Sequence, residues 1–130
     1  MKPYVYDEVE VVRVVDGDTA YLKLTKEFRQ EVDFGFRIYD EMILRKSTIL
    51  SFRLADIDAP EKRGIEKVAG LEAQAELERL LSLGKLRAET YKPDKYGRWL
   101  VVLFVTDPDG KTININEQMV KNGFAERYEG

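Results

Sequence analysis

Two acidic segments, far apart in the sequence, carry residue types suited to binding a cation. The first is Asp16-Gly17-Asp18, where Asp and Gly are also the residues that a tight hairpin turn requires. The second is the stretch 53–61, which reads Arg-Leu-Ala-Asp-Ile-Asp-Ala-Pro-Glu and in which the proline stops a strand. Each also has a structural interpretation, as a hairpin turn in the first case and as solvated acids beside a surface ion pair in the second.

The second segment places two carboxylates together if it is extended. Asp56 and Asp58 are two residues apart, so a strand would carry them on one face. Ionised groups on such a face lose hydration, which is unfavourable unless a cation or a hydrogen-bond donor lies against them. A bound cation would satisfy both segments if the fold brought Asp18 to the same place.

A third segment suits phosphate binding. Lys95-Tyr96-Gly97-Arg98 places two cations and an aromatic ring in and after a tight turn. Guanidinium and ammonium groups bind phosphate, and a neighbouring ring can stack on a base. The alternative is a solvated loop in which Arg98 begins a strand.

Composition narrows the chemistry that these segments can perform. The 130 residues include no His and no Cys, which excludes disulfides, Cys/His zinc sites, thiol nucleophiles and Ser-His-Asp triads. Catalysis must therefore use carboxylates, Lys, Arg, Tyr or a hard metal ion. The 21 basic and 24 acidic residues give a net charge of -3, which excludes a polybasic nucleic-acid coat and predicts weak, salt-dependent binding to nucleic acids.

Most of the sequence has the apolar alternation of β-strands. β-Branched residues precede the turn at 16–18, and alternation resumes after it. The expected strand segments are 9–15, 20–25, 32–38, 42–44, 49–54, 85–91 and 100–105, with tight turns at 93–97 and 108–110.

Two segments predict helices. Ala69, Ala73, Leu77 and Leu80 recur at steps of four and three, and Gly84 stands where a C-cap glycine belongs. A short second helix is expected over 115–122, with Gly123 just beyond it. We therefore expect one α+β domain over residues 1–130, mainly β, in which about two helices pack on a small barrel.

Four blocks of sequence together resemble the staphylococcal-nuclease-like (thermonuclease) domain family over nearly the whole chain. In the family's order they are Val-Asp-Gly-Asp-Thr at 15–19, Arg53 with Asp58, Pro60 and Glu61, Asp94-Lys95-Tyr96-Gly97-Arg98, and Asn116-Glu117 followed by Val120 and Gly123. The resemblance implies a five-stranded barrel of the OB-fold type. It also implies a calcium-dependent nuclease that hydrolyses phosphodiester bonds of DNA and RNA with little sequence specificity, leaving 3′-phosphates.

The resemblance assigns the metal ligands to the carboxylates of Asp18 and Asp58 and to the main-chain carbonyl of Ala59. Threonine is usual at the last position, but a main-chain ligand tolerates alanine. Oxygen ligands of this kind are what Ca²⁺ prefers, in agreement with a chain that has no His or Cys.

The same resemblance assigns catalytic and binding roles. Glu61 takes the place of the general base or water-orienting carboxylate, and Arg53 and Arg98 take the places of the two phosphate-binding arginines, which would stabilise charge on the phosphate. Further contacts to a phosphate or base fall on Lys95, Tyr96 and, with a shift of register, Tyr128.

The segment 28–50 is longer than in the compact secreted members of the family. It enlarges the strand pair before Arg53 and contains Phe34-Gly35-Phe36. Since Phe34 and Phe36 alternate as core residues do, we expect the insert to lengthen the barrel. Gripping a substrate or contacting another protein are the alternatives.

Two other functions remain open at this point. One is a catalytically weak or inactive OB-type module that binds nucleic acid, and the other is an interaction domain that docks through the insert. For the enzyme we expect a monomer acting on single-stranded or flexible DNA and RNA. No run approaches the roughly 20 apolar residues that span a bilayer, and no secretory leader is visible, so we expect a cytoplasmic protein, or a secreted one if a leader has been removed.

Overall fold

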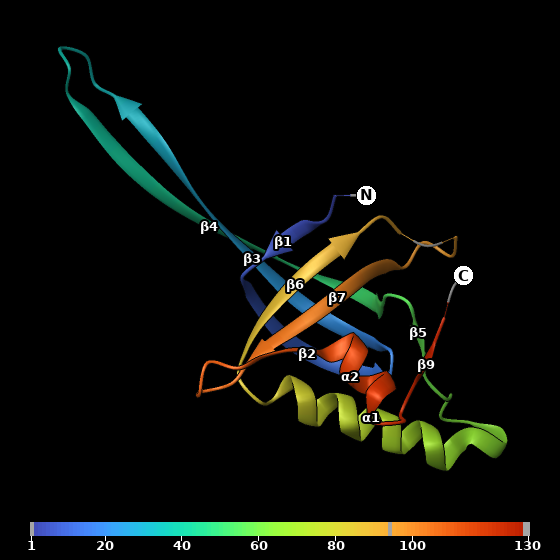
Figure 1. Cartoon of the computed structure of the whole chain (residues 1–130). Coiled ribbons are helices and arrows are strands. Elements are labelled where there is room, and N and C mark those ends of the chain that lie inside the picture. Colours follow the sequence, from blue (N-terminus) through green and yellow to red (C-terminus); the bar gives the residue numbers. More distant parts are fainter. Residues whose placement is uncertain (1, 94, 129–130) are drawn as a thin grey trace.

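The computed structural model describes residues 2–93 and 95–128 and is mainly β (Figure 1). Asp94, part of the turn predicted at 93–97, lies outside the described residues. The α+β class is confirmed. In chain order the described elements are β1 (Tyr4–Tyr6), β2 (Glu8–Asp16), β3 (Thr19–Asp33), β4 (Tyr39–Leu54), β5 (Ile57–Asp58), the 3-10 helix η1 (Gly64–Glu66), α1 (Lys67–Leu81), β6 (Lys85–Tyr91), β7 (Trp99–Thr106), β8 (Thr112–Asn114), α2 (Ile115–Lys121) and β9 (Glu126–Arg127).

The barrel closes because β1 and β2 behave as one bent strand with two partners. β1 pairs with β6, whereas β2 pairs with β3, and both pairings are antiparallel. The strand order β1-β6-β7-β4-β3-β2 therefore returns to its starting point, with β4 and β7 as the parallel pair. With β1 and β2 counted together, the described barrel has five main strands, as expected of the OB type.

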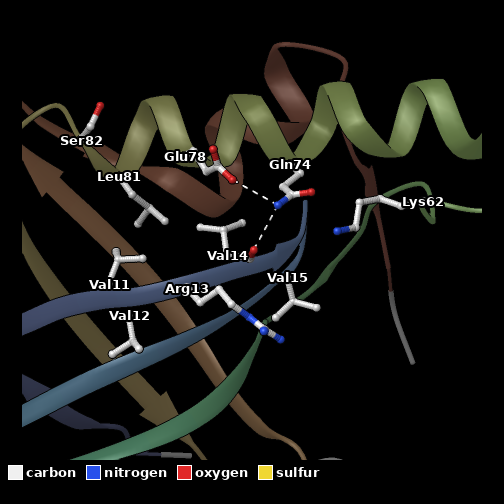
Figure 2. A pocket seen from close by; sticks show the side chains of 10 residues that line it. All are labelled: Val11, Val12, Arg13, Val14, Val15, Lys62, Gln74, Glu78, Leu81 and Ser82. Carbon is white, nitrogen blue, oxygen red and sulfur yellow. Dashed lines mark hydrogen bonds between the residues drawn. The ribbon is translucent and has the colours of Figure 1, made fainter.

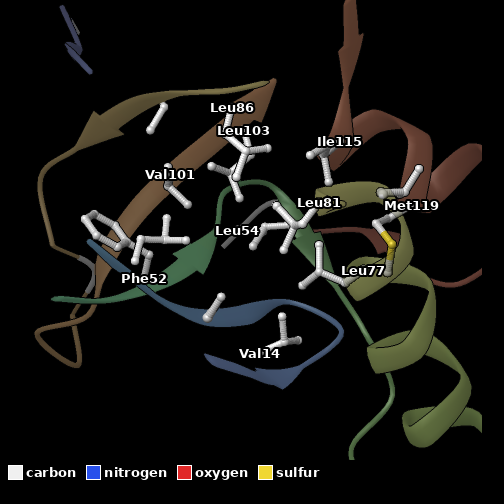
Figure 3. Close-up of a cluster of buried hydrophobic side chains, with 14 of the residues drawn as sticks. Val14, Phe52, Leu54, Leu77, Leu81, Leu86, Val101, Leu103, Ile115 and Met119 are labelled. Carbon is white, nitrogen blue, oxygen red and sulfur yellow. The ribbon is translucent and has the colours of Figure 1, made fainter. Parts of the chain in front are cut away.

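The core lies inside this barrel and under α1 (Figure 3). Alternate residues of the strands point inward, and burial of each large aliphatic side chain contributes about 1.5 to 3 kcal/mol. On α1 the predicted apolar face is buried at Ala73, Leu77 and Leu80, but Ala69 is exposed. The largest fully buried side chains are Leu22, Phe52, Leu54, Leu77, Leu80, Val101, Leu103, Val105, Ile115 and Met119.

Glu76 joins the two helices. Its carboxylate accepts hydrogen bonds from Arg79 Nε (2.6 Å) and Nη2 (3.0 Å) and from Asn122 Nδ2 (2.8 Å), beyond the end of α2. The Arg79 hydrogen bonds, helped by Asn122, lower the pKa of Glu76 even though burial opposes the shift.

Gly84 has a different role from the predicted one. The C-cap of α1 is Ser82, and Gly84 does not have a positive φ. A Cβ at Gly84 would collide with the carbonyl of Thr106 and come within 3.0 Å of Asp107 Cα. The chain therefore needs glycine there because β6 begins in close contact with the end of β7. Gly123 does have a positive φ of 82°, as a glycine after the end of α2 should.

The insert forms a hairpin that leaves the barrel (Figure 1). β3 and β4 pair without interruption from Thr19–Arg53 to Asp33–Tyr39, so the segments predicted at 42–44 and 49–54 belong to one strand. β2 follows β3 only as far as Thr25, and the rest projects away from the body of the protein. We call residues 26–46 the arm.

The expectation that the insert lengthens the barrel is wrong. Phe34 and Phe36 lie at the tip of the arm, and Phe36 is 98% exposed. Alternation identifies the two faces of a strand but does not reveal whether anything covers them. In the part of the chain that the structure describes, no helix is long and apolar enough to cross a membrane.

Candidate active site

The pairing of β3 with β4 brings the two acidic segments together at one end of the barrel. Thr19 is paired with Arg53, and Leu54 N donates to the carbonyl of Asp18 at 2.8 Å. The guanidinium of Arg53 then lies between two carboxylates, with Nη2 3.1 Å from Asp58 Oδ1 and 3.7 Å from Asp18 Oδ2. Residues 40 positions apart in the sequence thus share one site.

These groups line a pocket of about 270 Å³ whose walls are mostly polar and charged. All six residues to which a metal-binding or catalytic role was assigned line this pocket, including Arg98, which directly precedes β7. Its lining residues are Asp16, Asp18, Thr19, Arg53, Asp58, Ala59, Pro60, Glu61, Arg98 and Tyr128.

Asp18 is buried and well supported. Oδ1 accepts from the hydroxyl of Thr19 (3.0 Å), and Oδ2 accepts from the main-chain N–H of Ala59 (2.9 Å). The second bond fixes the segment that carries Asp58 to the β2–β3 turn. The turn itself packs tightly, since a Cβ at Gly17 would lie 2.6 Å from Ala73 Cβ and 2.9 Å from Ala59 Cβ, so glycine is needed to bring it against α1.

Arg53 is buried and held in one orientation. Besides its contacts with the two carboxylates, Nη2 donates to the carbonyl of Ile57 at 3.1 Å. Its guanidinium lies 5.0 Å from the ring centroid of Tyr128, within the range of a cation–π contact. Tyr128 is placed there by β9, which pairs with β5, and by its own N–H, which donates to the carbonyl of Asp56 at 2.9 Å.

Asp56 does not share a face with Asp58, contrary to the prediction from alternation. It lies in the turn between β4 and β5 with a φ of 64°, in the left-handed region that non-glycine residues seldom adopt. Asp56 lines a second cavity of about 230 Å³, which shares Arg53, Arg98 and Tyr128 with the first. That cavity is formed by Arg53, Asp56, Lys95, Tyr96, Arg98, Leu100 and Tyr128.

The second cavity gathers the predicted substrate-binding residues. The Tyr96 ring lies 5.3 Å from Lys95 Nζ and 5.4 Å from the Arg98 guanidinium. Tyr128 and Arg98 line both cavities, which joins the acidic pocket to the aromatic one.

Glu61 lines the acidic pocket from its outer rim. Its side chain is 71% exposed, and Oε2 lies 3.5 Å from Arg63 Nε. Its main-chain N–H donates to Glu66 Oε2 at 3.1 Å, just before α1. A Cβ at Gly70 would collide with the main-chain carbonyl of Glu61, so this glycine lets α1 approach the rim.

Asp16 also belongs to the site, although the sequence predicted only that it lies in the turn at 16–18. It lines the acidic pocket, where burial, followed by the charge of Asp18, raises its pKa; Glu61 adds to the shift, while Lys62 and Arg63 oppose it. The signal available in the sequence was the acid two positions before Asp18, because the two residues flank a single glycine.

The donor chemistry of the pocket fits a hard cation. Asp18, Asp58 and the main chain of Ala59 meet within it and supply only oxygen ligands. Burial and the neighbouring charge of Asp18 raise the pKa of Asp16 in the same pocket. Within residues 2–93 and 95–128, however, no three acidic side chains lie close enough together to hold a metal by themselves. A main-chain carbonyl would therefore have to complete such a site.

A larger hollow than the acidic pocket lies elsewhere, and none of the residues with an assigned role line it. It measures about 730 Å³ and lies open between β2 and α1 (Figure 2). Gln74 crosses it, and its Nε2 donates to the carbonyl of Val14 and to Glu78 Oε1, both at 3.1 Å. Its valine-rich wall belongs to β2, so we assign it to helix–strand packing.

Comparison with known proteins identifies the family. Residues 51–130 match the model of the family described as staphylococcal nuclease homologue, and the chain belongs to this family. The matched range contains Arg53, Asp58, Glu61 and Arg98, whereas Asp18 precedes it.

Individual relatives agree with this assignment. The chain is 32% identical to a protein named micrococcal nuclease from Shigella flexneri over 123 residues, which cover 92% of this chain and 57% of that protein. It is 29% identical to an uncharacterized protein of Methanocaldococcus jannaschii, over 92% of this chain and 58% of that one. A protein named "Probable endonuclease LCL3" from Verticillium alfalfae is 33% identical over 65% of this chain and 30% of its own length. The chain thus spans less than two thirds of the length of each.

Proposed function

We propose that this chain is a nuclease that hydrolyses phosphodiester bonds of DNA and RNA with little sequence specificity. The observation that carries the proposal is that Arg53 and Arg98 reach the same pocket as Asp18, Asp58 and Glu61. Two guanidinium groups facing a set of carboxylates suit a reaction in which negative charge develops on a phosphate while water attacks it. Membership of the nuclease family and the names of two relatives support the same class of reaction.

Calcium is the proposed cofactor. Asp18, Asp58 and the carbonyl of Ala59 would hold it, in accord with their position in one pocket and with the oxygen-only donor set. When bound, such an ion supplies charge stabilisation to a phosphate oxygen and a lowered pKa to a bound water.

The protein's own residues bind and orient the phosphate. Arg53 is held by Ile57 and Tyr128, so its guanidinium needs little reorganisation to donate to a non-bridging oxygen. Arg98 lines the same pocket and supplies a second guanidinium. Glu61, at the exposed rim, accepts a proton from the attacking water or orients it. Water adds to phosphorus and the bond to the 5′ oxygen breaks, which leaves a 3′-phosphate and a 5′-hydroxyl.

The second cavity favours a flexible or single-stranded substrate. Lys95, Tyr96 and Tyr128 lie beside the phosphate pocket and offer a cation and two rings to a neighbouring phosphate and base. A base reaches such a cavity only when it is unstacked from its neighbours, which costs less in a single strand.

A binding module without catalysis is the alternative. It is favoured by one observation: Glu61 is mostly exposed and its Oε2 pairs with Arg63 instead of an inward-facing group. In that case the same cavities would bind single strands without cleaving them.

One experiment separates the two functions. The protein is incubated with fluorescein-labelled single-stranded DNA and RNA, with calcium or with a calcium chelator, and both cleavage and anisotropy are recorded. We expect calcium-dependent cleavage that falls on the order of 10²-fold in Glu61→Gln and is unchanged in the control Glu72→Gln, an exposed acid on α1. Binding by a folded wild type without cleavage would establish the alternative, and cleavage that persists in the chelator would refute the calcium mechanism.

A further inference from the structure

The arm has one apolar face and one charged face. β3 and β4 are in register along its whole length, so side chains directly opposite each other share a face. One face continues the side of β3 that carries Leu22 and Leu24 into the core. We call it the apolar face of the arm, and its cross-strand pairs from base to tip are Lys26–Lys46, Phe28–Leu44, Gln30–Met42 and Val32–Asp40.

Both arginines on the other face form ion pairs within the chain. Arg45 pairs with Glu27, directly opposite it, and with Glu8, while Arg29 lies 3.6 Å from Glu41. On the apolar face the situation differs. Within the described residues, neither Lys46 nor Asp40 takes part in an ion pair.

The apolar face has no cover in the described part of the chain. Beyond Thr25, β3 pairs only with β4, and β4 meets β7 only from Phe52 onward. Phe28 and Met42 are exposed on this face, and Leu44 and Val32 are half-buried. A two-stranded ribbon with such side chains is marginally stable in water, and apolar surface of this kind marks interaction sites.

Nucleic acid is a poor partner for this face. The arm has five basic and five acidic residues, so its net charge is zero. A surface without net positive charge lacks the electrostatic attraction that supplies most nonspecific affinity for nucleic acid. The face carries Lys26 and Lys46 at its base and Asp40 near its tip. The occupant must therefore offer apolar groups, with an acidic group opposite the base and a basic group opposite the tip.

A second copy of the chain offers this pattern, and we propose that two copies associate through the apolar faces of their arms, packed antiparallel. The two-fold axis lies across the arm, between the pairs Phe28–Leu44 and Gln30–Met42. Each β4 then faces the other β4, with Leu44 against Met42 of the second copy. Lys46 at the base faces Asp40 near the tip of the second copy, and the symmetry forms this ion pair twice. Such a dimer replaces the monomer expected from the sequence.

The tip also finds a partner in this arrangement. About eight residues separate the base from the tip, or roughly 26 Å of strand, so Phe34 and Phe36 of one copy reach the base of the other arm. There Lys26 Nζ lies 5.7 Å from the Tyr6 ring, and Tyr4 on the same strand is largely exposed. Apolar contacts at both ends enlarge an interface that two ribbons alone would leave small.

The test uses two neighbouring residues of β4 that face opposite ways. Met42 is 48% exposed on the apolar face, and Ile43 is 53% exposed on the charged face. In sedimentation velocity from about 1 to 100 μM we expect a wild-type dimer whose dissociation constant rises at least about tenfold in Met42→Glu and changes less than about threefold in Ile43→Glu. Circular dichroism melting of each variant shows whether the barrel remains folded.

A charge exchange tests the orientation. Lys46→Asp and Asp40→Lys should each weaken the dimer, and the double variant should restore it, because both symmetric pairs are then rebuilt with reversed sign. A monomeric wild type throughout this concentration range would overturn the proposal, as would equal effects of Met42→Glu and Ile43→Glu. Failure of the double variant to regain affinity would overturn the antiparallel arrangement. None of these results depends on nuclease activity.

Discussion

Asn116, in the first turn of α2, connects the helix to β7 and to the end of β4. It is buried, and its Oδ1 accepts from Leu103 N at 3.1 Å. Its Nδ2 donates to the carbonyls of Ala55 (3.0 Å) and Val101 (2.9 Å). Ala55 directly follows the end of β4 and precedes the turn that places Asp58, so this one amide helps to fix the floor of the acidic pocket.

Replacement by alanine should destabilise the protein by about 3 kcal/mol. The Val101 carbonyl keeps a second donor, Ala55 N, at 2.9 Å, so two main-chain groups lose their partner: Leu103 N–H and the Ala55 carbonyl. A buried group without a partner costs about 1 to 3 kcal/mol. For a chain of this length, the expected loss lowers the melting temperature by roughly 10 °C.

Asn114→Ala is the matched control. Asn114 caps the same helix, and its side chain accepts only from Glu117 N at 3.1 Å. Loss of such a cap costs about 1 kcal/mol. Urea unfolding followed by Trp fluorescence gives both free energies. If Asn116→Ala costs no more than Asn114→Ala, the assignment of Asn116 as a central tie between helix and strands is wrong.

Three further perturbations test separate parts of the structure. Arg53→Lys should keep the fold but lower the rate of oligonucleotide cleavage on the order of 10²-fold, because an ammonium cannot contact a phosphate at two points; a rate within threefold of wild type would contradict the assigned role. Gly84→Ala should lower the free energy of unfolding by about 1 to 3 kcal/mol, since the new Cβ would collide with the Thr106 carbonyl. A melting temperature equal to that of the wild type would show that β6 and β7 can move apart at this point at no cost. The folded-state pKa of Glu76 is lowered, so its stabilisation is complete above the unfolded-state value of about 4.5 and is lost as the pH falls through the folded-state value. The stability difference between wild type and Glu76→Gln should therefore be large at pH 7 and shrink below pH 4.5, and a difference that stays constant with pH would refute this linkage.

Many residues of the site could be predicted from local patterns in the sequence. Asp-Gly-Asp between two alternating segments predicts a hairpin turn, and Asp18 lies in this turn directly before β3. A proline after Asp58 predicts the end of a strand near an acid. The order of these blocks also identified the family correctly, since each block reflects a local requirement for particular residue types.

Other features depended on contacts between distant segments. The left-handed turn at Asp56 breaks the alternation that would have placed it beside Asp58, and it does so because the chain must leave β4 and enter β5 within two residues. Asp16 belongs to the site because the hairpin of β2 and β3 places it, with Asp18, in the lining of the acidic pocket. The turn at Asp56 has no signal in residue types alone, whereas the only sequence signal for Asp16 was its position two residues before Asp18.

The sequence by itself determined most of the strands and the two α-helices. It also determined which functional groups are available for catalysis, namely carboxylates and guanidinium groups, with no His or Cys. These follow from local periodicity and from composition, which need no knowledge of the partner of any segment. Only the tertiary structure decided that Arg53 lies between Asp18 and Asp58, and that Phe36 is in water instead of in the core. Both depend on strand register and on what covers each face, which are properties of segments far apart in the chain.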